Sequence, residues 1–592
     1  KESSKGWRIK YYKGLGTSTT KEAKEYFKQL KVITYNLPEE SIDNLDPNLE
    51  DHESKQDTNN VLNDLDLAFN KKRSHDRKDW LIAYDKTNIP DYNNKNISVN
   101  EFVNQELIHF SNEDNDRSIP NIMDGCKPSQ RKVLYGSFKR NLKTEIKVAQ
   151  LAGYISEHAA YHHGEVSLEN TIKNMAQDFV SSNNLNYLCP IGQFGSRLMG
   201  GDDAAQSRYI FTKLSNITRA VFKKNDDCLV QYLDDDGYSI EPAYYYPIIP
   251  TILVNGSTGI GTGFSTDIPK HNPLDISQYI LDLIDGKIPK IPQPWYRGFN
   301  GRIEPTSVGS YITRGRIEYI NDGTLRITEL PIGSWTERYV EFLNKISVER
   351  GKETAKNFIR TYTDNSTETQ VDITIKINPL NINKWRNKFG KDGVSELENR
   401  LKLTSTIGTS NMHMFDENCK ITKFYNVESI IEKWFTIRKE IYIKRRDYLL
   451  NQLKKELDII KFKVKFIEEI INDTILFKNV KKAAIILNLE EKNYPKISLK
   501  DTTDPSYDYL LGMDLYKLTK EEIDDLRQKK EFKESEYNTL LSKTATELWK
   551  EDIHEFIDIY TKDLKDYTKE HGPLKSTVKL KKTKKYKNKC PL

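Results

Sequence analysis

The sequence predicts a multidomain α+β protein, and three observations support this fold class. The chain has 592 residues, too many for one hydrophobic core, so we expect roughly three to five domains. Within residues 300–380, apolar and polar side chains alternate with the period of strands. Between residues 450 and 471, apolar residues recur at alternating steps of three and four, which is the pattern of a coiled-coil helix.

Composition and charge exclude several classes of protein. Hydrophobic residues make up 37% of the chain, and no apolar run is long enough to span a bilayer, so we expect no membrane insertion. A net charge of only +5 argues against a protein that coats nucleic acid uniformly. The five cysteines are never at CxxC spacing, which disfavours a disulfide framework and a zinc site and favours a reducing compartment.

The N-terminal part begins with a strand pattern and a glycine turn in residues 7–18. Thr19 has the position of a helix cap for a helix that begins near Lys21. Residues 37–66 are acidic and rich in Asn, so we expect a loop or linker there. A helical pattern follows from Ser74, with Pro128 marking a turn before the next helix. Because the chain starts at Lys1 and not at Met, we expect an excised fragment or a processed product.

The middle of the chain mixes helices and strands. Residues 244–254 are apolar and β-prone, and they run into an Asn-Gly turn, which predicts a strand. Residues 325–330 and 371–377 alternate more clearly, and they predict strands of a separate α/β module.

The last third predicts a long helical arm. Its apolar stripe consists of Leu450, Leu453, Leu457, Ile460, Val464, Ile467 and Ile471. A charged helical pattern over residues 521–566 predicts a helix that returns alongside, and residues 507–518 predict a compact apolar knot at the far end. The tail at 575–589 holds eight lysines in fifteen residues, and we expect it to be disordered.

Tyr209 is the most informative candidate for chemistry. A phenol has a pKa of about 10 and is a poor nucleophile at neutral pH, but a neighbouring cation favours the phenolate. Arg208 supplies that cation and also a planar fork of donors for phosphate oxygens. With 33 tyrosines in the chain, however, an Arg-Tyr pair taken alone would almost always be structural.

The surroundings of this pair resemble the DNA-cleavage core of eukaryotic-type, ATP-dependent type II DNA topoisomerases. The resemblance runs in order from Arg117 to Pro269 and is carried by the segments Asp124-Gly-Cys-Lys-Pro-Ser-Gln-Arg131, Tyr161-His-His-Gly164, Ile191-Gly-Gln-Phe-Gly195, Arg208-Tyr-Ile-Phe211 and Asn255-Gly-Ser-Thr-Gly-Ile-Gly261. It implies that Tyr209 is the nucleophile that attacks a DNA phosphodiester. It also implies that Arg208 stabilises the transition state.

The resemblance extends to five further residues around the scissile phosphate. It implies that Lys127 and Arg131 contact phosphates, with Arg131 counted in the catalytic group; a solvated helix face is the alternative for both. It implies that His162 and His163 orient the 3′ end, although a pair of histidines alone would more often be packed or exposed without a role. It also implies that Tyr161 contacts the DNA backbone.

Three more residues are implied to act on DNA farther along the chain. Ser167 resembles a further backbone contact. Ile260 resembles an apolar wedge that enters a base step and bends DNA, and its alternative is an anchor for a turn. Trp335 resembles a DNA contact in the module beside the gate, and a core tryptophan is a competitive alternative.

Near the N-terminus, Tyr12 and Lys13 lie in a segment that resembles the last part of a TOPRIM domain, and they are implied to contact DNA. The carboxylates that hold Mg²⁺ in this family are expected upstream of the chain, and ATP is expected to bind an absent domain. We therefore expect no metal site within these residues.

The resemblance implies a particular domain order. The expected parts are the end of a TOPRIM domain (1–36), a linker (37–73), a winged-helix breakage-reunion domain (74–275), an α/β tower (276–420), a coiled-coil arm with the C-gate (421–566) and a basic tail (567–592). The implied protein is a homodimeric isomerase of double-stranded DNA, with a lower dimer contact near Leu510 and Leu511. We expect it in the nucleus or, alternatively, at a viral replication site in the cytoplasm.

Two other functions fit parts of the same pattern. A non-catalytic DNA clamp or architectural relative would explain missing metal carboxylates, but the intact Arg208-Tyr209 pair argues against it. The A-type subunit of a split topoisomerase would take its metal half from another polypeptide, which the N-terminal TOPRIM-like segment on the same chain disfavours.

Overall fold

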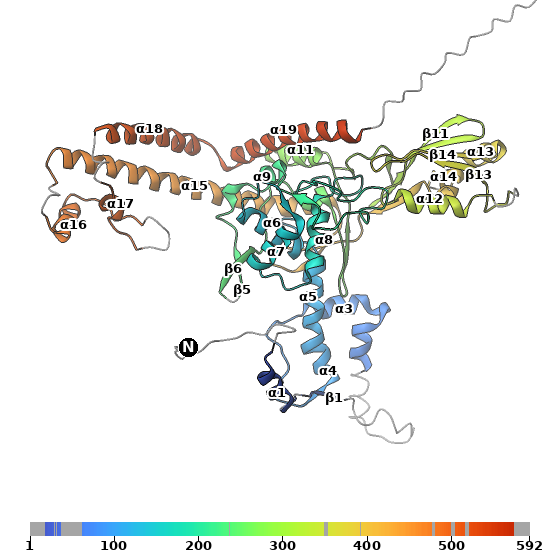
Figure 1. Ribbon diagram of the computed structural model, residues 1–592, viewed down its shortest axis with the longest axis horizontal. Helices are drawn as coiled ribbons and strands as arrows, with labels where there is room; N and C mark the ends of the chain where they lie inside the picture. Colours follow the sequence, from blue (N-terminus) through green and yellow to red (C-terminus); the bar gives the residue numbers. More distant parts are fainter. Residues whose placement is uncertain are drawn as a thin grey trace, which may run out of the picture. The chain divides into compact units, whose positions relative to one another are not determined.

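The computed structural model describes most of the chain, namely residues 18–28, 30, 32–36, 62–235, 237–348, 353–390, 392–475, 480–498, 504–514 and 520–572. Its contacts divide the chain into two units (Figure 1). The first unit combines residues 1–119 with residues 260–265, and the second combines residues 120–259 with residues 266–592. The division therefore falls after Ile119, whereas the sequence suggested a boundary at residue 74.

The first unit begins with helix α1 (Thr20–Lys28). The cap at Thr19 is confirmed, because its hydroxyl accepts from the amide of Glu22 at 3.3 Å while the Glu22 carboxylate accepts from the Thr19 amide at 2.6 Å. Strand β1 (Thr34–Asn36) pairs in parallel with β2 (Asn96–Ser98).

A small helical core explains why this unit extends to residue 119. Residues 62–69 are helical, so the expectation of a loop or linker is wrong for them; residues 37–61 lie outside the described residues. Leu65 and Ala68, three positions apart on one helix face, pack against Val99 and Val103. The other helices of the unit are η2 (Lys71–Arg73), α3 (Ser74–Ile82) and the continuous run α4 (Val99–Glu101), η3 (Phe102–Leu107) and α5 (Ile108–Ser118).

The second unit opens with a three-helix group and a hairpin, the arrangement expected of a winged helix. The helices are α6 (Pro128–Lys139), α7 (Val148–His158) and α8 (Glu165–Ala176). The start of α6 at Pro128 confirms the predicted turn, since proline suits the first position of a helix. The strands are β3 (Ile146–Lys147), which pairs with β4 (Phe211–Thr212), and the hairpin of β5 (Tyr232–Asp235) and β6 (Tyr238–Pro242).

The predicted strand at residues 244–254 is wrong. Residues 244–250 form no strand, with bends at Ile248 and Ile249, and the segment then forms the short helix α10 (Thr251–Asn255). Pro247 and Pro250 lack the amide hydrogen that a ladder requires, and the apolar side chains are instead buried in the main core. Around it lie α9 (Asn216–Val221), η4 (Lys224–Asp226), β7 (Ser257–Ile260), β8 (Ser265–Ile268) and α11 (Pro273–Ile284).

Within its described residues, the α/β module contains two antiparallel sheets. One has the order β15-β10-β9, from Thr404–Gly408, Ser310–Arg314 and Arg302–Ser307. The other has the order β11-β12-β14-β13, from Arg316–Asn321, Thr324–Glu329, Ile373–Ile377 and Ile359–Asp364. The strands predicted at 325–330 and 371–377 are confirmed as the paired β12 and β14. Helices α12 (Thr336–Lys345), α13 (Pro379–Arg386) and α14 (Glu396–Arg400) complete the module.

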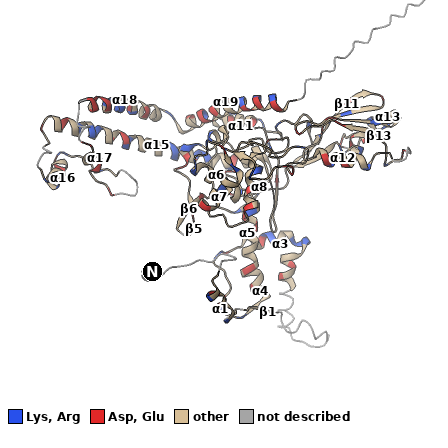
Figure 2. Ribbon diagram, viewed as in Figure 1, with Lys and Arg blue, Asp and Glu red and all other residues tan. Residues whose placement is uncertain are grey.

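The arm consists of a long helix and a helix that returns beside it. A hairpin of β16 (Met412–Phe415) and β17 (Ile421–Phe424) leads into α15 (Val427–Ile471), which covers the whole predicted apolar stripe. Helix α18 (Lys520–Ser542) lies along α15 with both signs of charge on the pair (Figures 1 and 2). It runs antiparallel, because Arg527 pairs with Glu468 whereas Lys533 pairs with Glu456.

The returning helix predicted over 521–566 is two helices. Thr544 caps α19 (Ala545–His571), since its side chain accepts from the Glu547 amide at 3.2 Å and its amide donates to the Glu547 carboxylate. Arg446 of α15 donates to the carbonyl groups of Leu541 and Lys543 at the end of α18. The break lets α19 leave the arm and bury its Trp549 side chain in the main core.

Of the predicted apolar knot at the far end of the arm, residues 507–514 are described and contain α17 (Asp508–Leu511), while residues 515–518 lie outside the described residues. Together with α16 (Lys482–Glu491), this segment packs on the end of α15. Leu510 is buried within this knot, so it is a core residue of one chain, while Leu511 stays partly exposed. Among the helices that the structure describes, none combines the length and the apolar character needed to cross a bilayer.

Candidate active site

Tyr209 lies on a short backbone segment that is fixed on both sides. The carbonyl groups of Ser207 and Ile210 accept hydrogen bonds from the amides of Ala149 and Val148, at 3.2 Å and 3.0 Å. These amides open α7 and have no partner within their own helix. Ser207 and Ile210 are buried, whereas 65% of Tyr209 is exposed. The backbone is therefore held while the phenol faces solvent.

Arg208 accompanies the phenol. Its guanidinium carbon lies 4.8 Å from the centroid of the Tyr209 ring, within the range of a cation–π contact. Among the described residues, no carboxylate forms an ion pair with Arg208, and its side chain is exposed. The five donors of this fork are therefore available to an anion from outside.

The motif around Gly192 supports the tyrosine segment from behind. Ile191 exchanges two backbone hydrogen bonds with Phe211, at 2.9 Å and 3.2 Å. Gly192 has φ of +104°, and a Cβ added there would lie 3.0 Å from a methyl carbon of Ile210. This combination of positive φ and close approach favours glycine, which explains why residue 192 of the motif is a glycine.

The two histidines have different surroundings. His162 forms a contact of 2.9 Å between its Nε2 and the Asp235 carboxylate on β5. His163 packs edge-on against Tyr161, with ring centroids 5.5 Å apart. Both histidines are exposed, just before α8. The Asp235 contact leaves Nδ1 of His162 as the ring nitrogen that can face a substrate.

Lys127 and Arg131, which were expected to act alike, have different surroundings. Lys127 is partly buried at the start of α6, its Nζ donates to the Thr258 carbonyl at 2.7 Å, and burial lowers its pKa. Arg131 is only 6% exposed and forms a bidentate pair with Asp124, at 2.7 Å and 3.0 Å. It also donates to the Cys126 carbonyl. Its Nε and one of its two terminal nitrogens are therefore used inside the fold, and the phosphate-contacting, catalytic role of Arg131 stays a prediction.

A cavity of about 540 Å³ brings Lys127 and Trp335 together. Trp335 is partly exposed and rests on Gly200, which has φ of +70° and where a Cβ would lie 2.2 Å from the indole. Lys270 also lines the cavity; its ammonium group donates to the carbonyl groups of Ser181 (2.8 Å) and Ser182, and its enclosure lowers its pKa to about 8. This cavity joins α6 to the α/β module.

Two other predicted site residues are exposed. Ser167 lies in the first turn of α8 with its side chain open to solvent. Ile260 ends β7 and is 83% exposed, which makes its apolar side chain available for contact. The turn after it is fixed within its own unit, because Thr262 donates to Asp114 at 3.1 Å and Gly261 packs on Asn115.

Some predicted features cannot be placed. Tyr12, Lys13 and the lysine-rich tail lie outside the described residues. Within the described part of the chain, no group of three or more His, Cys, Asp or Glu side chains could hold a metal ion. These residues therefore do not by themselves fit a Mg²⁺ site.

Sequence reasoning missed two members of this site. The sequence around Lys270 does not indicate a site residue, because an isolated lysine after a proline is common on protein surfaces. The same holds for Asp235, since it is 73 positions from His162 and only the fold brings the two together.

Comparison with known proteins identifies the family. The family model for the A-type subunit of DNA gyrase/topoisomerase IV matches residues 117–554, and the model of the C-terminal associated domain of TOPRIM matches residues 1–115. DNA topoisomerase 2 of Plasmodium falciparum is 44% identical over 578 residues, covering 93% of this chain and 39% of that protein. DNA topoisomerase 2 of Saccharomyces cerevisiae is 40% identical over 593 residues, covering 93% and 40%.

A solved structure agrees with these relatives. The crystal structure of the Plasmodium falciparum topoisomerase II DNA-binding, cleavage and re-ligation domain superposes with a TM-score of 0.78 at 41% identity. The match covers 96% of this chain and 76% of that one. The chain spans about two fifths of the length of the curated relatives, at 39% and 40%. It belongs to the type II DNA topoisomerase family, with the fold of the part that binds, cleaves and rejoins DNA.

Proposed function

We propose that this chain forms the DNA gate of a homodimeric type II topoisomerase that changes the topology of double-stranded DNA. The observation that carries the proposal is the exposed Tyr209 beside Arg208 on a backbone anchored to α7. A nucleophile of this kind needs a reachable oxygen and a fixed position, and Tyr209 combines both.

The proposed reaction is a reversible transesterification. The Tyr209 Oη attacks the phosphorus of one strand, a new P–O bond to tyrosine forms, and the bond from phosphorus to the 3′ oxygen breaks. The phenolic proton leaves the nucleophile and the 3′ oxygen gains a proton, so the products are a 5′-phosphotyrosyl end and a free 3′ hydroxyl. The reverse attack by that hydroxyl reseals the strand. A second protomer cuts the opposite strand, and another duplex passes through the gap.

Other residues would bind and orient the DNA. The Arg208 fork stabilises charge on the phosphate oxygens, since planar bidentate donors fit that geometry. His162 and His163 orient the 3′ end, and Tyr161 and Ser167 contact the backbone.

Lys127 and Trp335 form a wider DNA contact along their shared cavity. The exposed Ile260 bends the cut segment; unstacking a base step costs a few kcal/mol, which additional contacts to bent DNA offset.

Mg²⁺ and ATP are proposed as requirements of the whole protein. The described residues do not fit a metal site alone, so we assign no step of the reaction to Mg²⁺. ATP would drive the gating movements, whereas resealing uses the energy conserved in the phosphotyrosyl bond. We propose a nuclear location, with a cytoplasmic site of viral replication as the alternative.

Tyr209→Phe tests the proposal in the full natural protein that carries this sequence. The wild type should be trapped covalently on end-labelled DNA, whereas the variant should bind DNA with similar affinity and form no covalent complex. The matched control is Tyr425→Phe, because Tyr425 is similarly exposed and has the Lys423 ammonium group 5.1 Å from its ring. If a wild-type protein bound DNA without any covalent complex, a DNA clamp would be the better description.

A further inference from the structure

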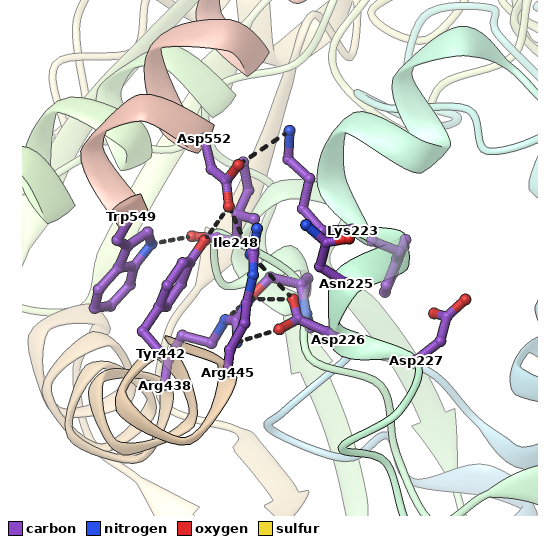
Figure 3. A network of polar contacts seen from close by, with 12 residues as sticks. Lys223, Asn225, Asp226, Asp227, Ile248, Arg438, Tyr442, Arg445, Trp549 and Asp552 are labelled. Carbon is purple, nitrogen blue, oxygen red and sulfur yellow. Dashed lines mark hydrogen bonds and ion pairs between the residues drawn. The ribbon is translucent and has the colours of Figure 1, made fainter. Parts of the chain in front are cut away.

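Three segments that are distant in the sequence meet at a buried ionic cluster where the arm leaves the main core (Figure 3). We call it the arm-root cluster, and its charged members are Lys223, Asp226, Arg438, Arg445 and Asp552. The first two follow α9, the two arginines belong to α15, and Asp552 belongs to α19. Each segment forms an ion pair with both of the others.

Asp226 joins the turn after α9 to α15. Its carboxylate accepts from Arg438 at 2.6 Å and lies 3.7 Å from Arg445. Arg438 is fully buried and also donates to the Pro247 carbonyl at 2.9 Å. The two arginines are seven positions apart, two turns of helix, so both lie on the face of α15 that meets this turn.

Asp552 joins α19 to the other two segments. It accepts from Arg445 at 2.7 Å and from the Tyr442 hydroxyl at 2.8 Å, and it lies 3.3 Å from the Lys223 ammonium group. Tyr442 stacks on Trp549, with ring centroids 5.0 Å apart, and the Trp549 indole donates to the Ile248 carbonyl. An apolar and aromatic layer therefore surrounds the ions.

Stability alone does not explain such a cluster. Replacing a buried ion pair by apolar residues of similar size is often neutral or stabilising, because desolvation offsets the attraction. Ion pairs differ from apolar contacts in direction and partner choice, so they fix one register between packed segments. The cluster can therefore set how α15 and α19 are held against the turn after α9.

The turn is a short covalent distance from the nucleophile. From Tyr209 the chain passes through β4 and α9 before it reaches Lys223. Helix α9 is anchored on the way, because the Thr218 hydroxyl donates to the Tyr187 carbonyl at 2.6 Å. A displacement of the arm would thus reach the tyrosine-bearing segment through packed and hydrogen-bonded elements.

We propose that Arg445 and Asp552 are positioning residues that couple the arm to the DNA gate during strand passage. This inference rests on the proposed function. Arg445 contacts both the partly buried Asp552 and the buried Asp226, close to Asp552 and farther from Asp226. Its buried Nε has no hydrogen-bond partner among the described residues. Arg445 therefore has one N–H group that is not hydrogen-bonded, and Asp226 is a second acceptor nearby. In this proposal, Arg445 exchanges between the two carboxylates when the arm moves.

The double variant Arg445→Met/Asp552→Asn tests the coupling in the full natural protein. It removes one charge of each sign, and Asn retains an oxygen that can accept from Tyr442 and Lys223. The matched control is Arg527→Met/Glu468→Gln, which removes a 2.6 Å pair that also joins two helices but lies along the arm. The three measurements are decatenation rate, the fraction of DNA trapped covalently, and the unfolding temperature.

We expect decatenation to fall about tenfold in the double variant, while the covalent fraction changes less than about twofold and the control behaves as wild type. Arg445→Lys keeps a cation between the carboxylates, so its decatenation rate should lie between the rates of the wild type and the double variant. Unchanged decatenation would overturn the inference. So would a parallel loss of decatenation, covalent complex and unfolding temperature, which indicates a stability role only. A wild-type protein without covalent complex would overturn the proposed function, and this inference with it.

Discussion

At the scale of single residues, the buried guanidinium of Arg131 contributes to folding through Asp124, whose carboxylate is also buried and accepts from the Tyr245 amide at 3.0 Å. Removing the cation would leave that carboxylate without its charge partner. Arg131→Met should therefore lower the free energy of unfolding by about 3–5 kcal/mol. Denaturant titration gives this value.

The same variant distinguishes the two roles considered for Arg131. Loss of a phosphate contact would weaken DNA binding uniformly and reduce the salt dependence of log K by about one unit, with stability unchanged. Lys127→Met is the matched comparison, because Lys127 lines the cavity with Trp335. An unchanged unfolding free energy for Arg131→Met, together with a reduced salt slope, would contradict the structural role.

His271 predicts a particular dependence of stability on pH. It is fully buried, its Nδ1 lies 3.1 Å from the Leu253 carbonyl oxygen, and burial lowers its pKa to about 4. The unfolded chain takes up a proton near pH 6.5 and the folded chain only near pH 4, so this contribution is complete above pH 6.5 and is lost as pH falls toward 4. Between pH 7 and pH 5 it should decrease by about 2 kcal/mol.

Denaturant titration at both pH values measures that decrease. His271→Gln removes the titrating group, so its unfolding free energy should fall less over the same interval. Equal losses in the two proteins would show that His271 is protonated in the fold at pH 5.

How far single residues were predictable depends on the range of their contacts. The pairing of Tyr209 with Arg208 was visible because their motif is local, whereas their exposure and the backbone bonds to α7 follow from the fold. The partner of Arg131 was not foreseen, although Asp124 is only seven positions away, because a helix-start lysine and arginine look alike in sequence. The chemical roles of Tyr209, Arg208 and Arg131 stay predictions.

At the scale of elements, the break between α18 and α19 depends on the cap at Thr544. Thr544→Ala should lower the free energy of unfolding by about 1 kcal/mol, because the Glu547 amide loses its acceptor. Thermal unfolding with Thr546→Ala as control measures the effect. A smaller loss for Thr544 than for Thr546 would show that the break has another cause.

Elements with a local period were predictable, and those governed by packing were not. Strands β12 and β14 and helix α15 follow apolar spacing that is visible in the sequence. Residues 244–254 have a β-prone composition, but two prolines and burial on all sides prevent a ladder. The separation of α18 from α19 was not predictable, because it involves a hydrogen bond from Arg446 of another helix, α15.

At the scale of the whole molecule, we predict a homodimer with a contact at the end of the arm. Leu511 is the partly exposed neighbour of the buried Leu510, so Leu511→Glu should shift sedimentation from twice the mass of one chain toward one. Leu487→Glu changes an exposed leucine of α16 in the same knot and is the control. A dimer that persists in Leu511→Glu would place the contact elsewhere.

The anchoring of Tyr209 to α7 has a mechanical consequence. In the proposed reaction, tension on a severed strand would pass from the phosphotyrosine into the peptide groups of Ser207 and Ile210. Their hydrogen bonds meet the first turn of α7, so the load is shared by two attachment points and spread along a helix. The Tyr209 ring can rotate about its side-chain bonds while the backbone of residues 207–210 stays in place. The covalently bound DNA end can therefore move with the gate without displacing that backbone.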